Sequence, residues 1–262
     1  MTRRQTNDIH ELYLASVQDP ESDVKRISNI FSNHFNKLAL TLREDFSGTF
    51  TISCSWVQSD KLRSAIAIDI DQKTLQYGKD NYLKNLSSDE QKRIKVLQSS
   101  AITKTEKVDI TATFNFSYCL IHKRKVLLEY LKKVHQSLNN DGMLIMDIMG
   151  GSDSEIPEIQ ETEINGHPHI TPFTFEFERK DFNPISRISN YAIHFKYPDK
   201  NEINNAFKYE FRMWSITEIR DLLEEAGYSK SIIYFEDDNG EYYQSEVEEN
   251  TISWNAFIVG LK

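Results

Sequence analysis

Two apolar segments in the first third of the chain constrain its fold more than any other feature. The first, LALTLREDF (38–46), runs into the turn Ser47-Gly48-Thr49, and the second, AIAIDID (65–71), ends on the carboxylate of Asp69. A strand, a tight glycine turn, a helix and a second strand that ends on an acid form the βαβ unit with which a parallel sheet binds an adenosine. The turn lets backbone approach the ligand, and the acid can accept from both ribose hydroxyls.

The glycine pattern narrows the choice of nucleotide. A dinucleotide site requires G-x-G-x-x-G, but here Phe46 and Phe50 flank the turn and only Gly48 remains. This argues against a pyrophosphate cradle and therefore against a Rossmann oxidoreductase. It favours an adenosyl ligand that carries no phosphates.

Composition excludes several classes of partner. The length of 262 residues suits one domain with an insertion, and the formal net charge of −9 argues against nucleic acid, because phosphate binding needs a basic surface. No apolar run reaches the roughly 18 residues that a membrane span needs, and the N-terminal residues are polar. Cys54 and Cys119 have neither metal-ligand nor disulfide spacing. We therefore expect a cytoplasmic protein without a membrane segment, either monomeric or homodimeric.

Hydrophobic periodicity predicts an α/β fold: a Rossmann-like, mostly parallel seven-strand sheet with helices on both faces and an antiparallel last strand. Between about 160 and 213 the helical period gives way to alternation, which predicts an inserted three-strand antiparallel β meander over the cleft. The expected domains are an N-terminal helical segment or lid (1–37) and a main domain (38–262) that contains this insertion. The strands expected in the sheet are 38–46, 64–70, 94–100, 108–116, 143–149, 231–236 and 254–262.

Several motifs together carry a family resemblance. The segments REDFSGT (43–49), AIAIDID, DITATFNFSY (109–118) and NNDGMLIMDIMGG (139–151) occur in that order. They resemble the nucleotide-binding core of class I S-adenosylmethionine-dependent methyltransferases, and more narrowly a subgroup whose first motif reads E-D-F-C-G-T. Members of that subgroup begin with Y-x-A-S-V-Q, here Tyr13 to Gln18, and end with R-x-W, a helix and an aromatic strand, here Arg212 to Glu236.

The resemblance implies S-adenosyl-L-methionine as cofactor and S-adenosyl-L-homocysteine as product. It implies that Glu44 orders the amino-acid end, where a negative charge attracts the ammonium and the sulfonium. Asp45 could share this role, and the sequence leaves open which of the two acids points toward the ligand. Asp69, with Ile70 beside it, is the expected ribose site.

The adenine site is expected at Ser100 and Ala101, after the third strand. The family commonly has an aspartate where this chain has Ser100, so backbone groups of Ala101 are expected to take over part of the contact.

Asn115 and Phe116 lie at the carboxyl end of the fourth strand, which in the resembled fold flanks the transferred methyl group. Tyr118 is the candidate catalytic hydroxyl; the alternative is an aromatic ring packed under a helix. His122 fits a helix cap better than a base. No metal is expected, because His167-Pro168-His169 has no carboxylate cluster near it in the sequence.

Two further segments have open roles. Tyr13 is expected in a lid over the cofactor or, equally, in a plain packing helix. Arg212 and Trp214 would share one face at the end of the third meander strand and bind an anionic or planar acceptor. The alternative is a structural pair in which Arg212 bridges to an acid.

The predicted function is methyl transfer from S-adenosyl-L-methionine to a small-molecule acceptor. The alternatives are a protein or peptide methyltransferase, or a non-catalytic adenosyl-binding protein of Rossmann fold. The absence of a catalytic triad is no objection, since the sulfonium already activates the methyl carbon and the enzyme mainly has to align the reactants.

Overall fold

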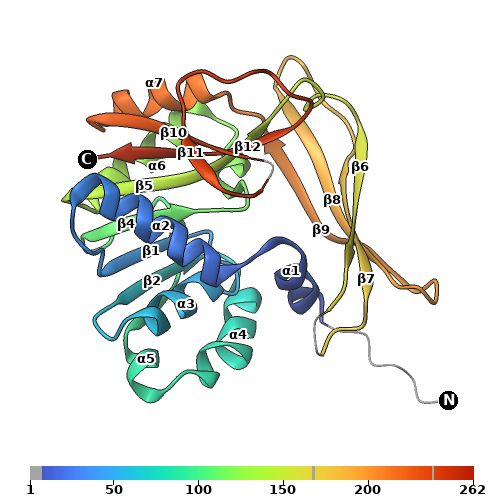
Figure 1. Ribbon diagram of the computed structural model, residues 1–262, viewed down its shortest axis with the longest axis horizontal. Helices are drawn as coiled ribbons and strands as arrows, with labels where there is room; N and C mark the ends of the chain where they lie inside the picture. The colour runs from blue at the N-terminus through green and yellow to red at the C-terminus, as the bar shows by residue number, and fades with distance from the viewer. Residues whose placement is uncertain (1–7, 167–168, 238) are drawn as a thin grey trace. The chain divides into compact units, whose positions relative to one another are not determined.

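The computed structural model describes residues 8–166, 169–237 and 239–262 (Figure 1). The chain divides into two compact units. The smaller contains the described residues up to Asp19 together with Glu155–Met213, and the larger contains Pro20–Ser154 and Trp214–Lys262. None of the helices in the described ranges is long and apolar enough to cross a membrane.

The larger unit is built on an eight-stranded sheet of order β11-β10-β12-β5-β4-β1-β2-β3. The pairs of β1 with β2 and β4, of β2 with β3, and of β4 with β5 are parallel, whereas β12 is antiparallel to β5 and β10. The strands are β1 (Thr41–Asp45), β2 (Ser64–Asp69), β3 (Ile94–Gln98), β4 (Val108–Thr113), β5 (Leu138–Gly150), β10 (Lys230–Glu236), β11 (Tyr242–Gln244) and β12 (Trp254–Leu261).

The prediction of seven strands is wrong by one. The additional strand is β11, which pairs with β10 and lies between the two expected strands 231–236 and 254–262. The ring of Tyr242 stacks on Phe257 of β12 with centroids 4.3 Å apart, so an aromatic contact holds this short segment against the sheet. A run of three residues is too short to show a period of its own.

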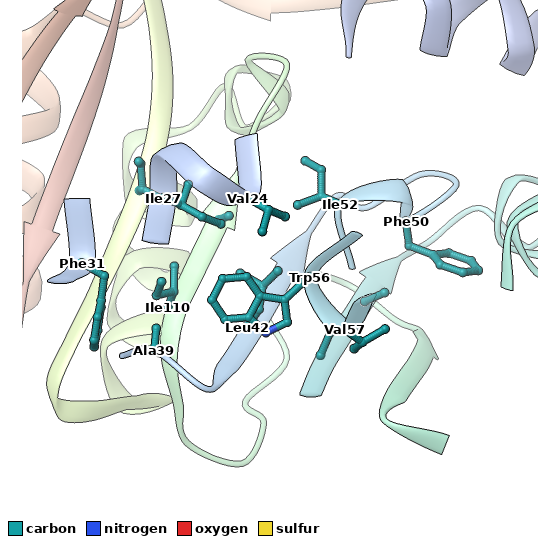
Figure 2. Packing of buried hydrophobic residues seen from close by; sticks show 14 of the residues in the cluster. Val24, Ile27, Phe31, Ala39, Leu42, Phe50, Ile52, Trp56, Val57 and Ile110 are labelled. Carbon is teal, nitrogen blue, oxygen red and sulfur yellow. The ribbon is translucent and has the colours of Figure 1, made fainter. Parts of the chain in front are cut away.

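Helices cover both faces of this sheet. Val24, Ile27 and Phe31 of α2 lie on one core cluster with Leu42 of β1 and Trp56 of α3, and all five are buried (Figure 2). On the other face, α6 contacts α7. The helices are α2 (Pro20–Phe35), α3 (Thr51–Ser59), α4 (Gln72–Asn81), α5 (Ser88–Lys92), α6 (Arg124–Gln136) and α7 (Ile216–Ala226), with single 3₁₀ turns at η1 (Leu83–Asn85) and η2 (Ser117–Leu120).

Local sequence signals account for several helix ends. Helix α2 starts at Pro20, and the Asp71 side chain accepts from the Thr74 N–H at the start of α4. Helix α7 has the capping box of Ser215 and Glu218 and ends at Gly227, whose φ is +102°.

The smaller unit contains α1 (Ile9–Val17) and a sheet of four antiparallel strands, β6 (Glu158–Ile164), β7 (Phe173–Arg179), β8 (Ile188–Lys196) and β9 (Glu202–Arg212). The three-strand meander is thus wrong by one strand. Strand β6 was missed because almost all of it is polar and exposed, so it lacks the alternation that revealed the other three. Leu12 of α1 is fully buried against the aromatic face that Phe173, Phe175 and Phe195 form.

Candidate functional site

The carboxyl ends of β1, β2, β3 and β4 lie at one edge of the larger unit's sheet, because these strands are parallel. Ligands bind at this edge in open α/β sheets. It is also where most of the residues that the sequence singles out come together. Each strand end contributes a different kind of group.

At the end of β1, alternation sends neighbouring acids to opposite faces of the sheet. The Glu44 carboxylate accepts hydrogen bonds from the Ser53 backbone N–H at 2.8 Å and from the Ser53 hydroxyl at 2.5 Å, both in α3. Asp45 instead pairs with Arg43 at 2.8 Å and accepts from the Tyr130 hydroxyl at 3.0 Å, in a network without solvent exposure. Glu44 therefore faces α3, and Asp45 belongs to the opposite side of the sheet, while a role of Glu44 toward the ligand stays a prediction.

The glycine turn and the end of β2 are bonded directly to each other. The Gly48 N–H donates to Asp69 Oδ2 at 2.8 Å, and the Asp71 N–H donates to Asp69 Oδ1 at 2.8 Å. A side chain at Gly48 would meet only the Thr74 methyl group, at 3.8 Å, so the space in front of the turn is open. Each Asp69 oxygen keeps a second lone pair that a ribose hydroxyl could use.

The turn keeps a glycine-like backbone even where the glycines are missing. Phe46, Gly48 and Phe50 have φ of +54°, +52° and +51°, a left-handed conformation that bulky residues rarely adopt. The Phe50 ring is fully buried, and a side chain at Gly78 would lie 2.5 Å from it. The aromatic rings change what surrounds the turn, while its backbone path remains that of a glycine-rich loop.

Ser47, in the middle of this turn, is a residue whose role the sequence did not indicate. It stands where the resembled subgroup has cysteine. Its hydroxyl is buried and has no hydrogen-bond partner among the described residues. An orphaned hydroxyl in a buried turn is costly unless a ligand satisfies it, so Ser47 fits a ligand site better than a purely structural one.

The loop after β3 is held from β1. Arg43 donates to the Ala101 carbonyl at 2.5 Å and to the Thr103 carbonyl at 3.0 Å. The Ser100 hydroxyl accepts from the Ile102 N–H at 3.3 Å. The Ala101 carbonyl is therefore already engaged, which leaves its N–H as the backbone group that adenine could use.

The end of β4 contains a second strained turn. Asn115 and Phe116 both have left-handed backbones, with φ of +57° and +56°. The Phe116 N–H donates at 2.9 Å to Asp147 of β5, a residue that the sequence analysis did not select. The signal was present: Asp147 is the one charged residue in the otherwise apolar run MLIMDIM.

Tyr118 is placed unfavourably for the predicted catalytic role. It lies in η2 with no exposed surface, and burial raises the pKa of its hydroxyl well above 10. Cys119, beside it, is also buried, and burial raises the pKa of its thiol. Both observations favour the alternative that Tyr118 is a packed aromatic.

Several carboxyl groups lie at this edge, and the pKa values of two of them are raised. Burial raises the pKa of Glu44 to about 8 against the lowering effect of the Ser53 hydrogen bonds, and the charges of Asp69 and Asp23 raise it further. Burial likewise raises the pKa of Asp147 to about 7, again with a contribution from Asp23. A cationic ligand would relieve this repulsion, and an anionic one would increase it.

No trio of histidine, cysteine and acidic side chains in the described part of the chain could hold a metal ion. His167 and Pro168 of the H-P-H segment lie outside the described residues.

The remaining predicted site residues divide between the two units. In the smaller unit, the ring of Tyr13 packs on Phe207 of β9 with centroids 4.9 Å apart. Arg212 is the last residue of β9, whereas Trp214 is buried in the larger unit. Because Trp214 lies beyond the end of β9, strand alternation does not place its side chain on the same face as that of Arg212. The acceptor and lid roles stay predictions.

Comparison with known proteins identifies the fold. No protein-family model matches the chain, and no curated protein matches it by sequence. Solved structures do match over the whole length, and the fold they share is that of S-adenosylmethionine-dependent methyltransferases.

Three examples show the extent of the match. CalS10, an amino pentose methyltransferase from Micromonospora echinaspora, has a TM-score of 0.72 at 8% identity, with 100% of this chain and 99% of that chain covered. KedS8, a sugar N-methyltransferase from Streptoalloteichus sp., has a TM-score of 0.66 at 11% identity. The match covers 100% of this chain and 95% of that chain. An S-adenosylmethionine-dependent methyltransferase from Clostridium acetobutylicum has a TM-score of 0.64 at 16% identity. The match covers 95% of this chain and 94% of that chain.

Proposed function

We propose that this protein transfers a methyl group from S-adenosyl-L-methionine to a small-molecule acceptor. The observation that carries the proposal is the bond from the Gly48 N–H to Asp69, which ties the turn after β1 to the acid that ends β2 in a methyltransferase fold. That pairing is what an adenosyl group with two free ribose hydroxyls requires.

The residues present suit this cofactor. Asp69 and Ile70 would hold the ribose, and Ser100 with the Ala101 N–H the adenine. The open space at Gly48 would accommodate the part of the cofactor nearest the turn, and the orphaned Ser47 hydroxyl would find a hydrogen-bond partner there.

The charged end of the cofactor has its own partners. Glu44 would face the ammonium and the sulfonium, and Asn115 and Phe116 would flank the methyl group. The acidic edge supports a ligand with two positive centres over a nucleotide with phosphates.

The chemistry asks little more of the protein than alignment. The sulfonium supplies an activated methyl carbon, so the acceptor needs an in-line approach, exclusion of water and, where it is protonated, a base. Asn115 and Phe116, held in a strained conformation, are suited to fixing that line of approach.

A small acceptor is supported by the proteins of similar fold, which include an amino pentose methyltransferase and a sugar N-methyltransferase. The motif REDFSGT supports membership of the E-D-F-C-G-T subgroup, and the composition supports a cytoplasmic protein. No observation on the structure favours a protein or peptide acceptor.

Calorimetric titration with S-adenosyl-L-homocysteine tests the proposal. We expect binding, a raised melting temperature and a loss of about 1–3 kcal/mol of affinity in Asp69→Ala, as for hydrogen bonds to a charged group. Asp80→Ala, an exposed acid of α4, is the matched control and should bind normally. Binding of NADH but not of S-adenosyl-L-homocysteine would contradict the proposal and favour an oxidoreductase.

A further inference from the structure

Asp147 is a carboxylate inside the apolar strand β5. Its side chain shares a face with Met143 and Ile145, which belong to the same core cluster as Val24 and Ile27 of α2. It is nevertheless partly exposed, so it lies where that core ends and the carboxyl edge of the sheet begins.

Hydrogen bonds hold Asp147, but no cationic side chain among the described residues pairs with it. Its Oδ1 accepts from the Phe116 N–H at 2.9 Å, and the Asn115 N–H is a second backbone donor. In the described ranges no lysine, arginine or histidine forms an ion pair with it, and the charge acting on it most, that of Asp23, has the same sign. Arg26, the cation of this region, is bound to Asp23 at 2.8 Å and lies over the ring of Tyr242.

This arrangement is difficult to explain as a purely structural device. If Asp147 served only to cap the turn at Asn115 and Phe116, an asparagine would accept the same hydrogen bonds without the cost of partly desolvating a charge. An aliphatic residue would pack better beside Met143 and Ile145. What the aspartate adds over both is a negative charge and the capacity to take up a proton.

Building on the proposed methyl transfer, we propose that Asp147 binds the protonated amino group of an amine acceptor and takes a proton from it. The carboxylate removes one proton from R–NH₃⁺, giving R–NH₂ and a neutral carboxylic acid. The freed lone pair attacks the methyl carbon and the carbon–sulfur bond breaks, its electron pair going to sulfur. The products are R–NH₂⁺–CH₃ and neutral S-adenosyl-L-homocysteine, and Asp147 returns its proton to water.

The electrostatics select this class of acceptor. An ammonium supplies the cation that Asp147 lacks, whereas an acceptor with a carboxylate or phosphate at this point would be repelled by Asp147 and Asp23 together. Because the free carboxyl has a pKa of about 7, it can release and accept a proton near neutral pH, as an effective base must.

The test compares one cell extract before and after its amines are blocked. Extract of the source organism is split, and one half is treated with acetic anhydride and then hydroxylamine, which leaves amines acetylated and hydroxyls free. Each half receives the full-length protein and methyl-tritiated S-adenosyl-L-methionine. We expect the label to enter small molecules of the untreated half. In the acetylated half we expect at least about tenfold less label, which corresponds to an at least tenfold lower rate of methyl transfer.

Each outcome bears on one proposal. Equal labelling of the halves would overturn the amine assignment and leave methyl transfer intact. Label in neither half, with S-adenosyl-L-homocysteine bound, would also overturn it, since the untreated half contains the cell's amines. Failure to bind S-adenosyl-L-homocysteine would instead overturn the proposed function.

Asp147→Asn separates chemistry from structure. It keeps an acceptor for the Phe116 N–H, so melting temperature and affinity for S-adenosyl-L-homocysteine should stay unchanged while labelling falls about a hundredfold or more. Asp141→Asn is the matched control, the same change on an exposed acid of β5 that pairs with Lys37. Full labelling by Asp147→Asn, or a parallel loss of stability and cofactor affinity, would overturn the assignment.

The pH profile of the unmodified protein is a second test. At a limiting amine concentration, the rate of labelling should rise as the pH passes through about 7. A flat profile would also overturn the assignment.

Discussion

At the scale of single residues, the candidate site depends on positions where the backbone is forced into unfavourable conformations. Phe46, Phe50, Asn115 and Phe116 all have left-handed backbones at the two turns of the carboxyl edge. Such strain costs of the order of 1–3 kcal/mol per residue and persists where the surrounding structure compensates for it. Of the eight non-glycine residues with positive φ in the described ranges, these four lie at this edge, which supports the proposed site.

Gly48→Val tests the position of the turn. Its φ of +52° suits glycine, and a branched side chain there costs stability and fills the open space in front of the turn. We expect a modest loss of melting temperature and no measurable binding of S-adenosyl-L-homocysteine. Gly166→Val, also at positive φ but with nothing within 4 Å, is the control for backbone strain alone. Normal binding by Gly48→Val would mean that the ligand does not approach this turn.

The buried Glu44 predicts pH-dependent binding. With its pKa raised to about 8, it is mostly protonated at neutral pH in the free protein, and a cationic ligand should lower that pKa and expel the proton. Affinity for S-adenosyl-L-methionine should therefore rise between pH 6 and about pH 8 and then level off.

The same pKa shift affects folding stability. Glu44 contributes less to the free energy of unfolding as the pH rises from about 4.5 to about 8, because the folded protein keeps the Glu44 proton up to a higher pH than the unfolded chain does.

Calorimetry at pH 7.5 in two buffers of different ionisation enthalpy measures the proton release. Glu44→Gln should abolish it, and S-adenosyl-L-homocysteine, which has no sulfonium charge, should show less of it than S-adenosyl-L-methionine. Binding without proton release in the unmodified protein would place Glu44 away from both cations.

At the scale of elements, strand β1 organises both sides of the site. Glu44 faces α3, while Arg43 and Asp45 point the other way and connect β1 to the loop after β3 and to Tyr130 of α6. One strand thus positions the acid that is proposed for the charged end of the ligand and, through Arg43, the loop that is proposed to hold its adenine.

Arg43→Leu should destabilise the fold by about 3–5 kcal/mol, because it leaves the Asp45 charge buried without its partner. The double change Arg43→Leu/Asp45→Leu removes both charges and should recover much of that stability. It should not recover affinity for S-adenosyl-L-homocysteine, since the Ala101 and Thr103 carbonyls remain unheld. Urea unfolding and calorimetry measure the two effects separately. A stable double variant with full affinity would show that Arg43 has only a structural role.

At the scale of the whole molecule, the chain consists of two units, and the N-terminal helix belongs with the inserted sheet. Leu12 has no exposed surface, and Tyr13 packs on Phe207 within the smaller unit. This supports the packing-helix alternative, while a lid function for the same segment stays a prediction.

Two substitutions distinguish packing from closure over the cofactor. Leu12→Ala should lower the stability of the smaller unit by about 2–5 kcal/mol, as for other buried leucines, without changing affinity for S-adenosyl-L-homocysteine. If α1 is also a lid, Tyr13→Ala should weaken that affinity, whereas the loss of its packing on Phe207 by itself should lower only the melting temperature. Loss of melting temperature alone in both variants would leave α1 as a packing element.

The sequence by itself determined the parallel core, the Gly48 turn and the place of Asp69 at the end of β2. These follow from local rules: continuous apolar runs form buried parallel strands, glycine permits the turn, and an acid at a strand end lies beside it. The two strands that it missed, β6 and β11, are a polar edge strand and a three-residue strand. Neither carries a hydrophobic period to read.

Tertiary structure alone decided the rest. Which of Glu44 and Asp45 faces α3 depends on strand register, and the exclusion of Tyr118 from solvent depends on packing around η2. The pairing of Asp147 in β5 with Phe116, in the turn after β4, joins residues 31 positions apart. Such contacts arise from sheet order and side-chain burial, which bring together groups that no spacing along the chain connects.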